Sequence, residues 1–292
     1  MRGKVITVDQ VIARIAGRQH GVVARWQLLG AGVTSREIEI RVGRGSLLPV
    51  LRGVYRVGHA APSVQSTYMA AVLACGEGAV LCGRAAAYLL GLIKGSPPPP
   101  EVLTRGERRI KGVRARRSRV IESIIWRGIP ITTPARTLVD LAAALNEEQL
   151  ARAAHEADVR YKTTPAQVEA VLRSRPRTNG ATMLRRVVSG DVKLVLSTLE
   201  RRFLALLREN DVPLPRTNRA AGGRFVDCRW PEHRLTVELD SYRFHNSRHA
   251  WEQDRRRERE AYARGDQHRR YTYRDVFEDP GQMLAELRTL LA

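Results

Sequence analysis

The sequence predicts a multidomain α+β fold, with a small helical unit that ends in a hairpin, a middle α/β region, and a C-terminal region of paired strands and helices. Three observations predict it. The chain has 292 residues, more than one average domain needs, and 43% of them are hydrophobic, which suffices for several cores. Apolar residues recur at helical spacing in some stretches and alternate in others. Clusters of glycine and proline separate these stretches, and we expect domains at residues 1–60, 61–196 and 197–292.

The composition excludes several classes of protein. No stretch approaches the roughly 20 uninterrupted apolar residues that span a bilayer, and residues 1–5 lack the apolar core of a secretion signal. Three cysteines, Cys75, Cys82 and Cys228, are too few for a disulfide framework. We expect Cys75 and Cys82 to be buried small residues rather than zinc ligands. The chain is therefore expected to be soluble and cytoplasmic, with no membrane partner.

Basic residues exceed acidic ones, and most of the excess lies in the first two thirds of the chain. There are 50 lysines and arginines against 30 aspartates and glutamates, a net charge of +20. Residues 1–196 hold 31 basic and 14 acidic side chains, whereas residues 197–292 hold 19 and 16. Such an excess indicates contact with nucleic acid, although an arginine-rich chain also carries it without a partner in some proteins.

Residues 8–60 carry the pattern of a helix-turn-helix followed by a hairpin. Apolar spacing predicts helices at Val8–Ala16, Ala24–Leu29 and Arg36–Arg44, with a glycine turn between the last two. Leu47–Val57 alternates as a hairpin does, with Gly53 near its centre. In a helix-turn-helix the second helix enters the major groove of DNA, and this hairpin resembles the wing of a winged helix.

The arginines of this unit are candidate DNA contacts. From the last helix, bases or phosphates are expected to meet Arg36, Arg41 and Arg44. From the hairpin, the DNA backbone is expected to meet Arg52 and Arg56. The alternative is that these side chains only solvate the helix face and the hairpin.

The middle region contains the densest basic stretch of the chain. Helices are predicted at Gln65–Ala74, Gly83–Leu92 and Ala135–Leu145, and a strand at Glu101–Thr104 follows four prolines. Between residues 105 and 119 stand eight lysines and arginines, interleaved with glycine, isoleucine and valine, which favours a basic hairpin over a disordered tail. The candidate DNA contacts in this hairpin are Arg114, Arg116 and Arg117.

Two acidic strands follow in the last region. They are predicted at Arg224–Trp230 and Arg234–Asp240, joined by a turn at Pro231–His233. If the turn centres on residues 232 and 233, paired residue numbers sum to 465, and Asp227 lies opposite Glu238 with β-carbons about 5 Å apart. Because side chains alternate along a strand, Asp240 is expected on the same face.

Carboxylates that face each other across a ladder repel, and a divalent cation removes that repulsion. Mg²⁺ takes oxygen ligands at about 2.0–2.1 Å, and a bound metal orients a phosphodiester and activates a water molecule. The candidate ligands for Mg²⁺ or Mn²⁺ are Asp227 and Glu238. The alternative is an amphipathic hairpin with its acids in solvent, which holds if the register slips by one residue.

The residues around these strands add further candidates. A helix is predicted from Thr198 to Glu209, with Ser197 as its cap and Glu200 in its first turn. His245 is a candidate general base. A polar helix is predicted at residues 250–263, where Arg255 and Arg256 either contact phosphates or solvate the helix. A last strand at residues 271–273 and a closing helix that opens at residue 274 complete the region.

This last region resembles the small nuclease-like domains related to very-short-patch-repair endonucleases. Those domains belong to the restriction-endonuclease-like superfamily, in which helices flank a mixed central sheet, and the resemblance implies metal-dependent cleavage of DNA. The matching segments are Leu199–Phe203, Val226–Leu235, Val237–Asp240, Tyr242–His245 and Asp254–Arg257.

The resemblance also implies a role for each acidic residue. Asp227 and Glu238 take the place of the metal ligands, Glu200 that of the first-helix acid, and His245 that of the histidine base. Asp240 takes the second position of the Glu-x-Lys/Asp pair, where many superfamily nucleases carry lysine, and Ser241 stands where these small domains usually have glycine.

Residues 8–196 resemble the AbiEi family of abortive-infection antitoxins, which are DNA-binding proteins with an N-terminal winged helix. The resemblance implies double-stranded DNA as a partner, and it leaves a cognate toxin and a homodimer open. The matching segments are Gly53–Arg56, Gly83–Ala87 with Gly91–Leu92, and Ile129–Ala142.

These patterns leave three hypotheses for the function. The first is a metal-dependent DNA endonuclease whose N-terminal part positions it on duplex DNA. The second is a transcriptional autorepressor or antitoxin whose nuclease fold is catalytically inactive. The third is a structural DNA-binding protein, which leaves the acidic strand pair unexplained. We favour the first, because a specific pair of opposed carboxylates needs a ligand.

Overall fold

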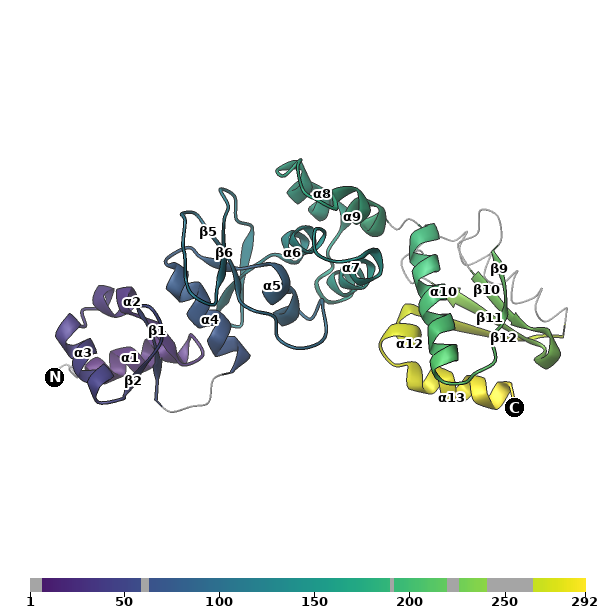
Figure 1. Ribbon diagram of the computed structural model, residues 1–292, viewed down its shortest axis with the longest axis horizontal. Helices are drawn as coiled ribbons and strands as arrows, with labels where there is room; N and C mark the ends of the chain where they lie inside the picture. The colour runs from purple at the N-terminus through teal and green to yellow at the C-terminus, as the bar shows by residue number, and fades with distance from the viewer. Residues whose placement is uncertain (1–6, 59–62, 190–191, 220–225, 241–264) are drawn as a thin grey trace, which may run out of the picture. The chain divides into compact units, whose positions relative to one another are not determined.

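The computed structural model describes residues 7–58, 63–189, 192–219, 226–240 and 265–292 (Figure 1). Within them the chain is a multidomain mixture of helices and three β-sheets, as the sequence predicts. It divides into two compact units, residues 1–185 and residues 186–292. No helix in the described ranges is both long and apolar enough to cross a membrane.

The first unit begins with three helices and a three-stranded sheet of order β1-β3-β2. The predicted helices and hairpin are confirmed, with a two-residue turn at Arg52-Gly53 between the last two strands. Thr7 and Thr34 set the starts of α1 and α3, because each accepts a hydrogen bond from the backbone of the first turn in a capping box. The elements are α1 (Val8–Gly17), β1 (Val22–Ala24), α2 (Arg25–Gly30), α3 (Ser35–Gly43), β2 (Leu47–Leu51) and β3 (Val54–Val57).

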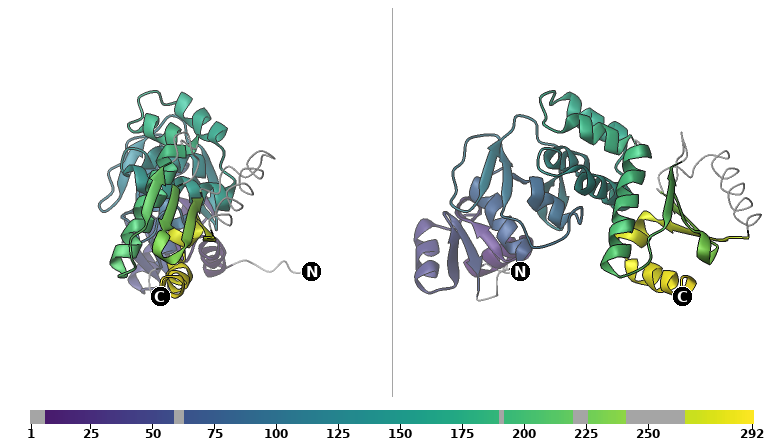
Figure 2. Two further views of the ribbon diagram at one scale, coloured as in Figure 1. Left: turned by 90° about the vertical axis from the view of Figure 1, so that its right-hand side faces the viewer. Right: turned by 45° about the vertical axis from the view of Figure 1, so that its right-hand side comes forward.

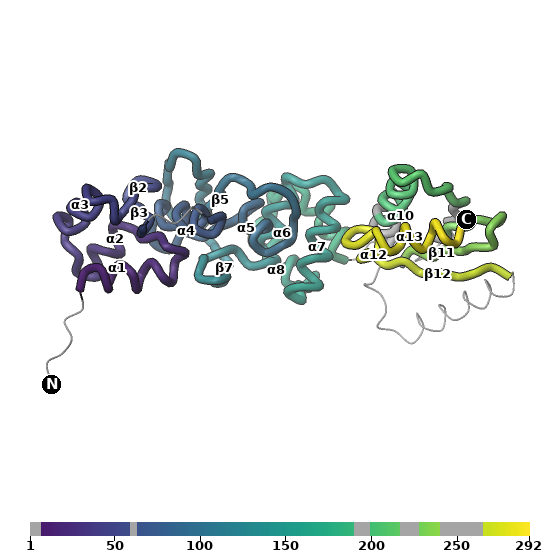
Figure 3. The backbone as a smooth tube through the Cα atoms, turned by 90° about the horizontal axis from the view of Figure 1, so that it is seen from below, coloured from purple at the N-terminus to yellow at the C-terminus, as the bar shows by residue number. Residues whose placement is uncertain are grey.

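The rest of this unit is a five-stranded sheet of order β6-β5-β4-β8-β7 with several helices, and Figure 3 traces helices α4 to α8 along this part of the chain. Buried side chains of α4, α5 and α6 form its core with the central strands. The elements are α4 (Val64–Cys75), β4 (Val80–Leu81), α5 (Gly83–Leu89), β5 (Glu101–Thr104), β6 (Arg114–Arg117), β7 (Ser123–Trp126), β8 (Ile129–Thr132), α6 (Pro134–Leu141), α7 (Glu147–Tyr161), α8 (Pro165–Arg173) and α9 (Ala181–Val188).

The predicted basic hairpin between residues 105 and 119 is wrong. Only β6 is a strand there, and it pairs with β5 in parallel, so residues 105–113 form a connection that holds one isolated bridge, between Ile110 and Val113. β4 already occupies the other side of β5, which leaves β6 the outer position in the sheet. Charged side chains on an outer strand hinder pairing with another sheet, which accounts for the arginines without a hairpin.

The turn between β7 and β8 contacts the α1–β1 segment within this unit. Arg127 and Gly128 both have positive φ, as a two-residue turn of this kind requires. A side chain at Gly128 would lie 2.7 Å from the carbonyl oxygen of Arg18, and His20 Nε2 lies 2.7 Å from the carbonyl oxygen of Arg127. The glycine is therefore needed both for the turn and for this close approach.

The second unit is a four-stranded mixed sheet of order β12-β11-β10-β9, in which β11 and β12 run parallel and the other pairs antiparallel. Helices α10, α12 and α13 lie together on one side of this sheet (Figure 2). The elements are α10 (Val192–Glu209), β9 (Arg216–Arg219), β10 (Val226–Trp230), the 3₁₀ turn η1 (Pro231–His233), β11 (Leu235–Asp240), β12 (Gln267–Thr272), α12 (Tyr273–Phe277) and α13 (Pro280–Leu290).

Three sequence predictions in this unit need correction. Helix α10 begins at Val192, so Ser197 lies inside it rather than at its cap, and the helix crosses the domain boundary expected at 196/197. Tyr271 and Thr272 end a longer strand than predicted, and Tyr273 already belongs to α12. Residues 274–277 belong to the separate short helix α12, so the closing helix starts at Pro280 rather than at residue 274.

Candidate functional site

The predicted register of the two acidic strands is confirmed. β10 and β11 pair antiparallel with Asp227 opposite Glu238, Cys228 opposite Val237 and Arg229 opposite Thr236. The alternative of a one-residue slip is therefore wrong. The turn η1 fixes the register, since Arg234 leaves it in the left-handed region with its backbone N–H bonded to the Pro231 carbonyl.

The two faces of this sheet have opposite character. Cys228, Trp230, Leu235, Val237, Leu239 and Tyr271 are buried in one core with residues of α10, α12 and α13. Because side chains alternate, Thr236 and Glu238 of β11 and His268 and Arg270 of β12 belong to the other face. We call these four residues, with Asp266 and Arg229, the polar face.

Glu238 is the centre of the polar face. It is only 1% exposed, and two groups of the neighbouring parallel strand approach the same carboxylate oxygen. Arg270 Nη2 donates a hydrogen bond to Glu238 Oε2 over 3.2 Å, and His268 Nε2 lies 3.7 Å from that oxygen. A buried carboxylate requires such a counter-charge, since removing it from water without one costs several kcal/mol or more.

A second ion pair lies next to Glu238 on the same face. Arg229 donates from Nε and Nη2 to the two carboxylate oxygens of Asp266, over 2.8 and 3.0 Å, and Thr236 donates to Asp266 Oδ2 over 2.9 Å. The hydrogen bonds to Asp266 raise the pKa of Arg229 above its usual value. This forked geometry is strong and specific, so it holds the start of β12 against β10 and β11.

Sequence reasoning missed Asp266, His268 and Arg270. One signal was available: Tyr271 and Tyr273 alternate, and extending that alternation backwards puts Arg269 on the apolar side and His268 and Arg270 on the other. Without the parallel pairing of β12 with β11, however, the sequence does not place these residues beside Glu238.

The described donors match the chemistry of a divalent metal but not a full ligand set. Glu238 supplies carboxylate oxygens, and His268 Nε2 is buried without a hydrogen-bond partner in the described part of the chain. Over the same residues, no group of three or more histidine, cysteine, aspartate or glutamate side chains is placed to hold a metal. A metal at Glu238 therefore requires a ligand beyond the described side chains, and the predicted one, Asp227, has its backbone opposite Glu238 while its side chain is outside the described residues.

The remaining predicted catalytic residues are distributed differently. Glu200 is almost fully buried on α10, the helix that packs against the apolar face of the sheet rather than the polar one. Asp240 is the last residue of β11 and pairs with Thr272 of β12, and its side chain is outside the description. The predicted residues His245, Arg255 and Arg256 also lie outside the described residues.

The predicted DNA contacts of the first unit separate into exposed and engaged arginines. Arg36, Arg44 and Arg52 are exposed. Arg41 is only 18% exposed, because its Nε donates to Asp9 Oδ1 over 2.8 Å and its Nη1 to the Glu37 carbonyl. The hydrogen bond from Arg41 lowers the pKa of Asp9.

Arg56 on the hairpin is partly buried.

On the outer strand β6, Arg114, Arg116 and Arg117 are all exposed, and Arg116 also contacts neighbouring side chains. Arg116 Nη2 lies 3.5 Å from Glu101 Oε2 and 3.6 Å from Cys82 Sγ. Cys82 is fully buried, as predicted, and burial raises the pKa of its thiol to about 12. Because 43% of its side chain is exposed, Arg116 stays accessible at the surface of the sheet.

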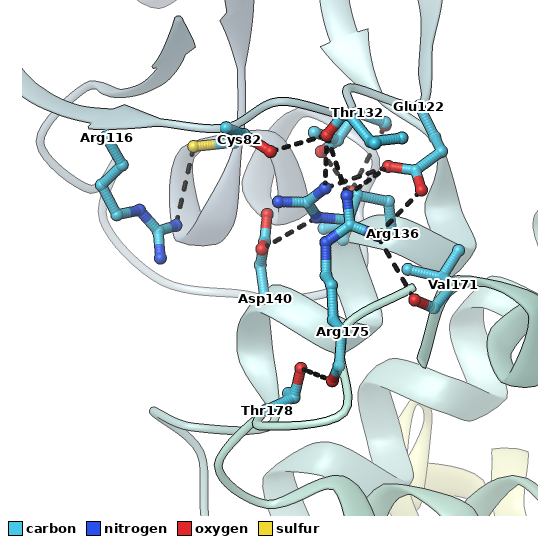
Figure 4. Close-up of polar contacts among 12 residues, drawn as sticks. Cys82, Arg116, Glu122, Thr132, Arg136, Asp140, Val171, Arg175 and Thr178 are labelled. Atoms are coloured by element: carbon cyan, nitrogen blue, oxygen red, sulfur yellow. Dashed lines mark hydrogen bonds and ion pairs between the residues drawn. The ribbon is translucent and has the colours of Figure 1, made fainter. Parts of the chain in front are cut away.

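Two residues of the 129–142 segment, Arg136 and Asp140, belong to a buried ion network (Figure 4). Arg136, on α6, donates to Glu122 over 3.0 Å and to Asp140, four residues on, over 3.1 Å. Arg175 donates to both oxygens of Glu122 over 2.8 Å, and Figure 4 shows the two guanidinium groups meeting at this carboxylate. Burial raises the pKa of Glu122, but hydrogen bonds from Arg175, its own backbone and Arg136 outweigh this and lower it. The network fixes α6 and the chain after α8 to the loop before β7.

No protein-family model matches this chain, and no curated protein resembles it closely enough to count as a match.

Proposed function

We propose that this chain is a DNA-binding protein whose second unit hydrolyses phosphodiester bonds of double-stranded DNA with Mg²⁺ or Mn²⁺. One observation carries the proposal: Asp227 and Glu238 are paired positions of the β10–β11 ladder, and Glu238 is buried on a polar sheet face beside His268 and Arg270. Opposed carboxylates at this position are unfavourable unless a cation lies between them. The resemblance of residues 197–292 to repair-endonuclease-like domains supports the same reading.

Each group has a role in this proposal. Asp227 and Glu238 would hold the metal, which would supply an activated water molecule and positive charge beside the phosphate. Arg270 supplies positive charge beside the phosphate, and the pair of Arg229 with Asp266 keeps β10, β11 and β12 in position. The first unit, whose α1-β1-α2-α3-β2-β3 order is that of a winged helix, presents Arg36, Arg44 and Arg52 to the duplex.

A second function is favoured by a specific observation. Arg270 already neutralises the charge of Glu238. Such a pair is expected in a nuclease fold that no longer binds a metal and only binds DNA. In that case the chain is a transcriptional repressor or antitoxin, as the resemblance of residues 8–196 to AbiEi antitoxins suggests.

Incubating the purified protein with supercoiled plasmid and Mg²⁺ or Mn²⁺ separates the two functions. We expect nicking by the wild type, and a fall of about a hundredfold or more in Asp227→Ala and Glu238→Ala, the scale of losing one group that stabilises a transition state. DNA retention in a gel shift should survive both changes. Glu232→Ala is the matched control, since Glu232 lies in the turn between the same strands and pairs with Arg216 at the surface.

The opposite result is equally clear. If the wild type binds the plasmid but leaves it intact with every divalent metal, the nuclease proposal is wrong and the repressor function takes its place. Equal nicking by wild type and Glu238→Ala would move the activity away from the β10–β11 pair.

A further inference from the structure

The Glu238–Arg270 pair joins a buried acid to a base that reaches solvent. The Glu238 side chain is 2% exposed, whereas that of Arg270 is 32% exposed. They stand at paired positions of the parallel β11–β12 ladder, so the backbone keeps them adjacent. The guanidinium can therefore leave the carboxylate for solvent by rotation of its own side chain, while Glu238 stays in place.

A metal ion and Arg270 would both contact the carboxylate of Glu238. The guanidinium contacts Oε2 of Glu238, the carboxylate that the proposed function assigns to the metal. Two cations next to one buried carboxylate repel, and in a site shielded from water that repulsion is much larger than at the surface. The carboxylate still needs one of them, because an uncompensated buried charge is strongly unfavourable.

We propose that Arg270 and the divalent metal exclude each other at Glu238: Arg270 balances its charge in the metal-free protein and is displaced to the sheet surface when the metal binds. This inference rests on the proposed function. It assigns Arg270 a positioning role, because the displaced guanidinium lies on the same face as the metal, where a DNA phosphate would approach. The competition between Arg270 and the metal also sets the metal concentration at which the site fills.

Among the described residues, the neighbouring arginines are held by other carboxylates. Arg229, on the same face, is held by both oxygens of Asp266. Arg269, the preceding residue of β12, is on the opposite face and donates to Glu286 of α13 over 2.6 Å. His268 also lies near Glu238 Oε2, and a histidine is charged only when protonated, so all measurements are made at one pH, pH 8.

The test is a calorimetric titration of the full-length protein with Mn²⁺ at pH 8. We expect Arg270→Gln to tighten the dissociation constant about tenfold or more, since a competing cation has been removed. Arg270→Lys keeps the charge and should bind like the wild type. Arg269→Gln is the matched control, because it removes the same charge from the adjacent residue on the other face, and it should also bind like the wild type. In a Glu238→Gln background, Arg270→Gln should have no effect.

A second measurement needs no substitution at Arg270 in the protein being observed. In wild-type protein labelled with ¹⁵N-arginine, saturating Mg²⁺ should shift the side-chain signal of Arg270, identified by its loss in Arg270→Lys. The same addition should leave that signal unchanged in Glu238→Gln. This readout keeps the inference open to refutation even if Arg270→Gln does not fold.

The outcomes distinguish this inference from the proposed function. Tighter Mn²⁺ binding by Arg270→Gln together with absence of cleavage by any variant supports the exclusion and overturns the nuclease. Equal Mn²⁺ affinity of folded Arg270→Gln and wild type overturns the exclusion and leaves the nuclease to the plasmid experiment. Failure of the wild type and all variants to bind either metal overturns both.

Discussion

At the scale of single residues, the same side-chain type serves opposite purposes in this chain. Arg136 is 5% exposed and Arg175 is 17% exposed, and both donate to Glu122, whereas Arg44 and Arg52 face solvent. Arginine suits both tasks because its planar guanidinium stays charged and donates several hydrogen bonds in fixed directions. Net charge alone therefore overstates the number of arginines that are available to a polyanion.

The Glu122 network makes stability depend on pH. Hydrogen bonds from Arg175 and Arg136 lower the pKa of Glu122 in the folded state. A carboxyl group with a lowered folded pKa stabilises the fold above its unfolded pKa of about 4.3, and this contribution is lost as the pH falls through the folded value. We expect Glu122→Gln to lower the free energy of unfolding by about 1–3 kcal/mol at pH 7, and the difference from wild type to shrink below pH 4. Urea unfolding at pH 7 and at pH 3.5 measures it.

The matched control for that prediction is Glu169→Gln. Glu169 also pairs with an arginine, Arg185 at 2.8 Å, but both side chains are exposed, so the substitution should change the unfolding midpoint little at either pH. A Glu122→Gln protein as stable as the wild type at pH 7 would show that the network orders the loop without stabilising the unit.

At the scale of elements, helix α3 shows how capping and packing leave only part of a helix for binding. Thr34 and Glu37 cap its start, Ile38 is buried in the core, and Asp9 of α1 holds Arg41. Arg36 and Arg44, at its two ends, remain exposed. Of the three arginines predicted to contact DNA from this helix, Arg36 and Arg44 are therefore the two that are exposed.

This arrangement predicts different roles for Arg41 and Arg44 in DNA binding. A phosphate contact contributes close to one unit to the slope of log K against log salt concentration. We expect Arg44→Gln to weaken binding and reduce the slope by about one, and Arg41→Gln to leave the slope unchanged because its charge is already balanced by Asp9. Fluorescence anisotropy with a duplex at several salt concentrations measures both. An equal loss of slope in Arg41→Gln would mean that the Asp9 pair opens on DNA.

The accuracy of the sequence predictions follows how local each element is. The β10–β11 register follows from a short turn and alternating side chains, all within 15 residues of sequence, and it is correct. The sequence does not predict most of β12, because Gln267–Thr272 is polar except for one tyrosine. Its parallel partner β11 is also distant in sequence, since residues 241–266 separate the two strands. The basic stretch was assigned to a hairpin because its pattern does not reveal that β6 pairs with β5 in parallel.

For the whole molecule, charge and acidic chemistry fall in separate compact units. Residues 1–185 hold 29 basic and 13 acidic side chains, and residues 186–292 hold 21 and 17. The first unit therefore carries an excess of 16 positive charges and the second only 4. Because phosphate contacts dominate non-specific affinity for DNA, binding and cleavage are expected to depend on different units.

This division predicts the behaviour of a fragment that ends after α9, at residue 189. We expect the fragment to retain most of the DNA affinity of the full chain and most of its salt slope, because the exposed candidate arginines Arg36, Arg44, Arg52, Arg114, Arg116 and Arg117 all lie within it. It should show no plasmid nicking, since β10 and β11 are absent. Circular dichroism checks that it folds, and anisotropy titrations of fragment and full chain at matched salt concentrations make the comparison. A slope that falls by half in the fragment would place as many phosphate contacts on residues 190–292 as on the rest, and the polar face around Glu238 would then be a principal DNA-binding surface rather than a site served by the first unit.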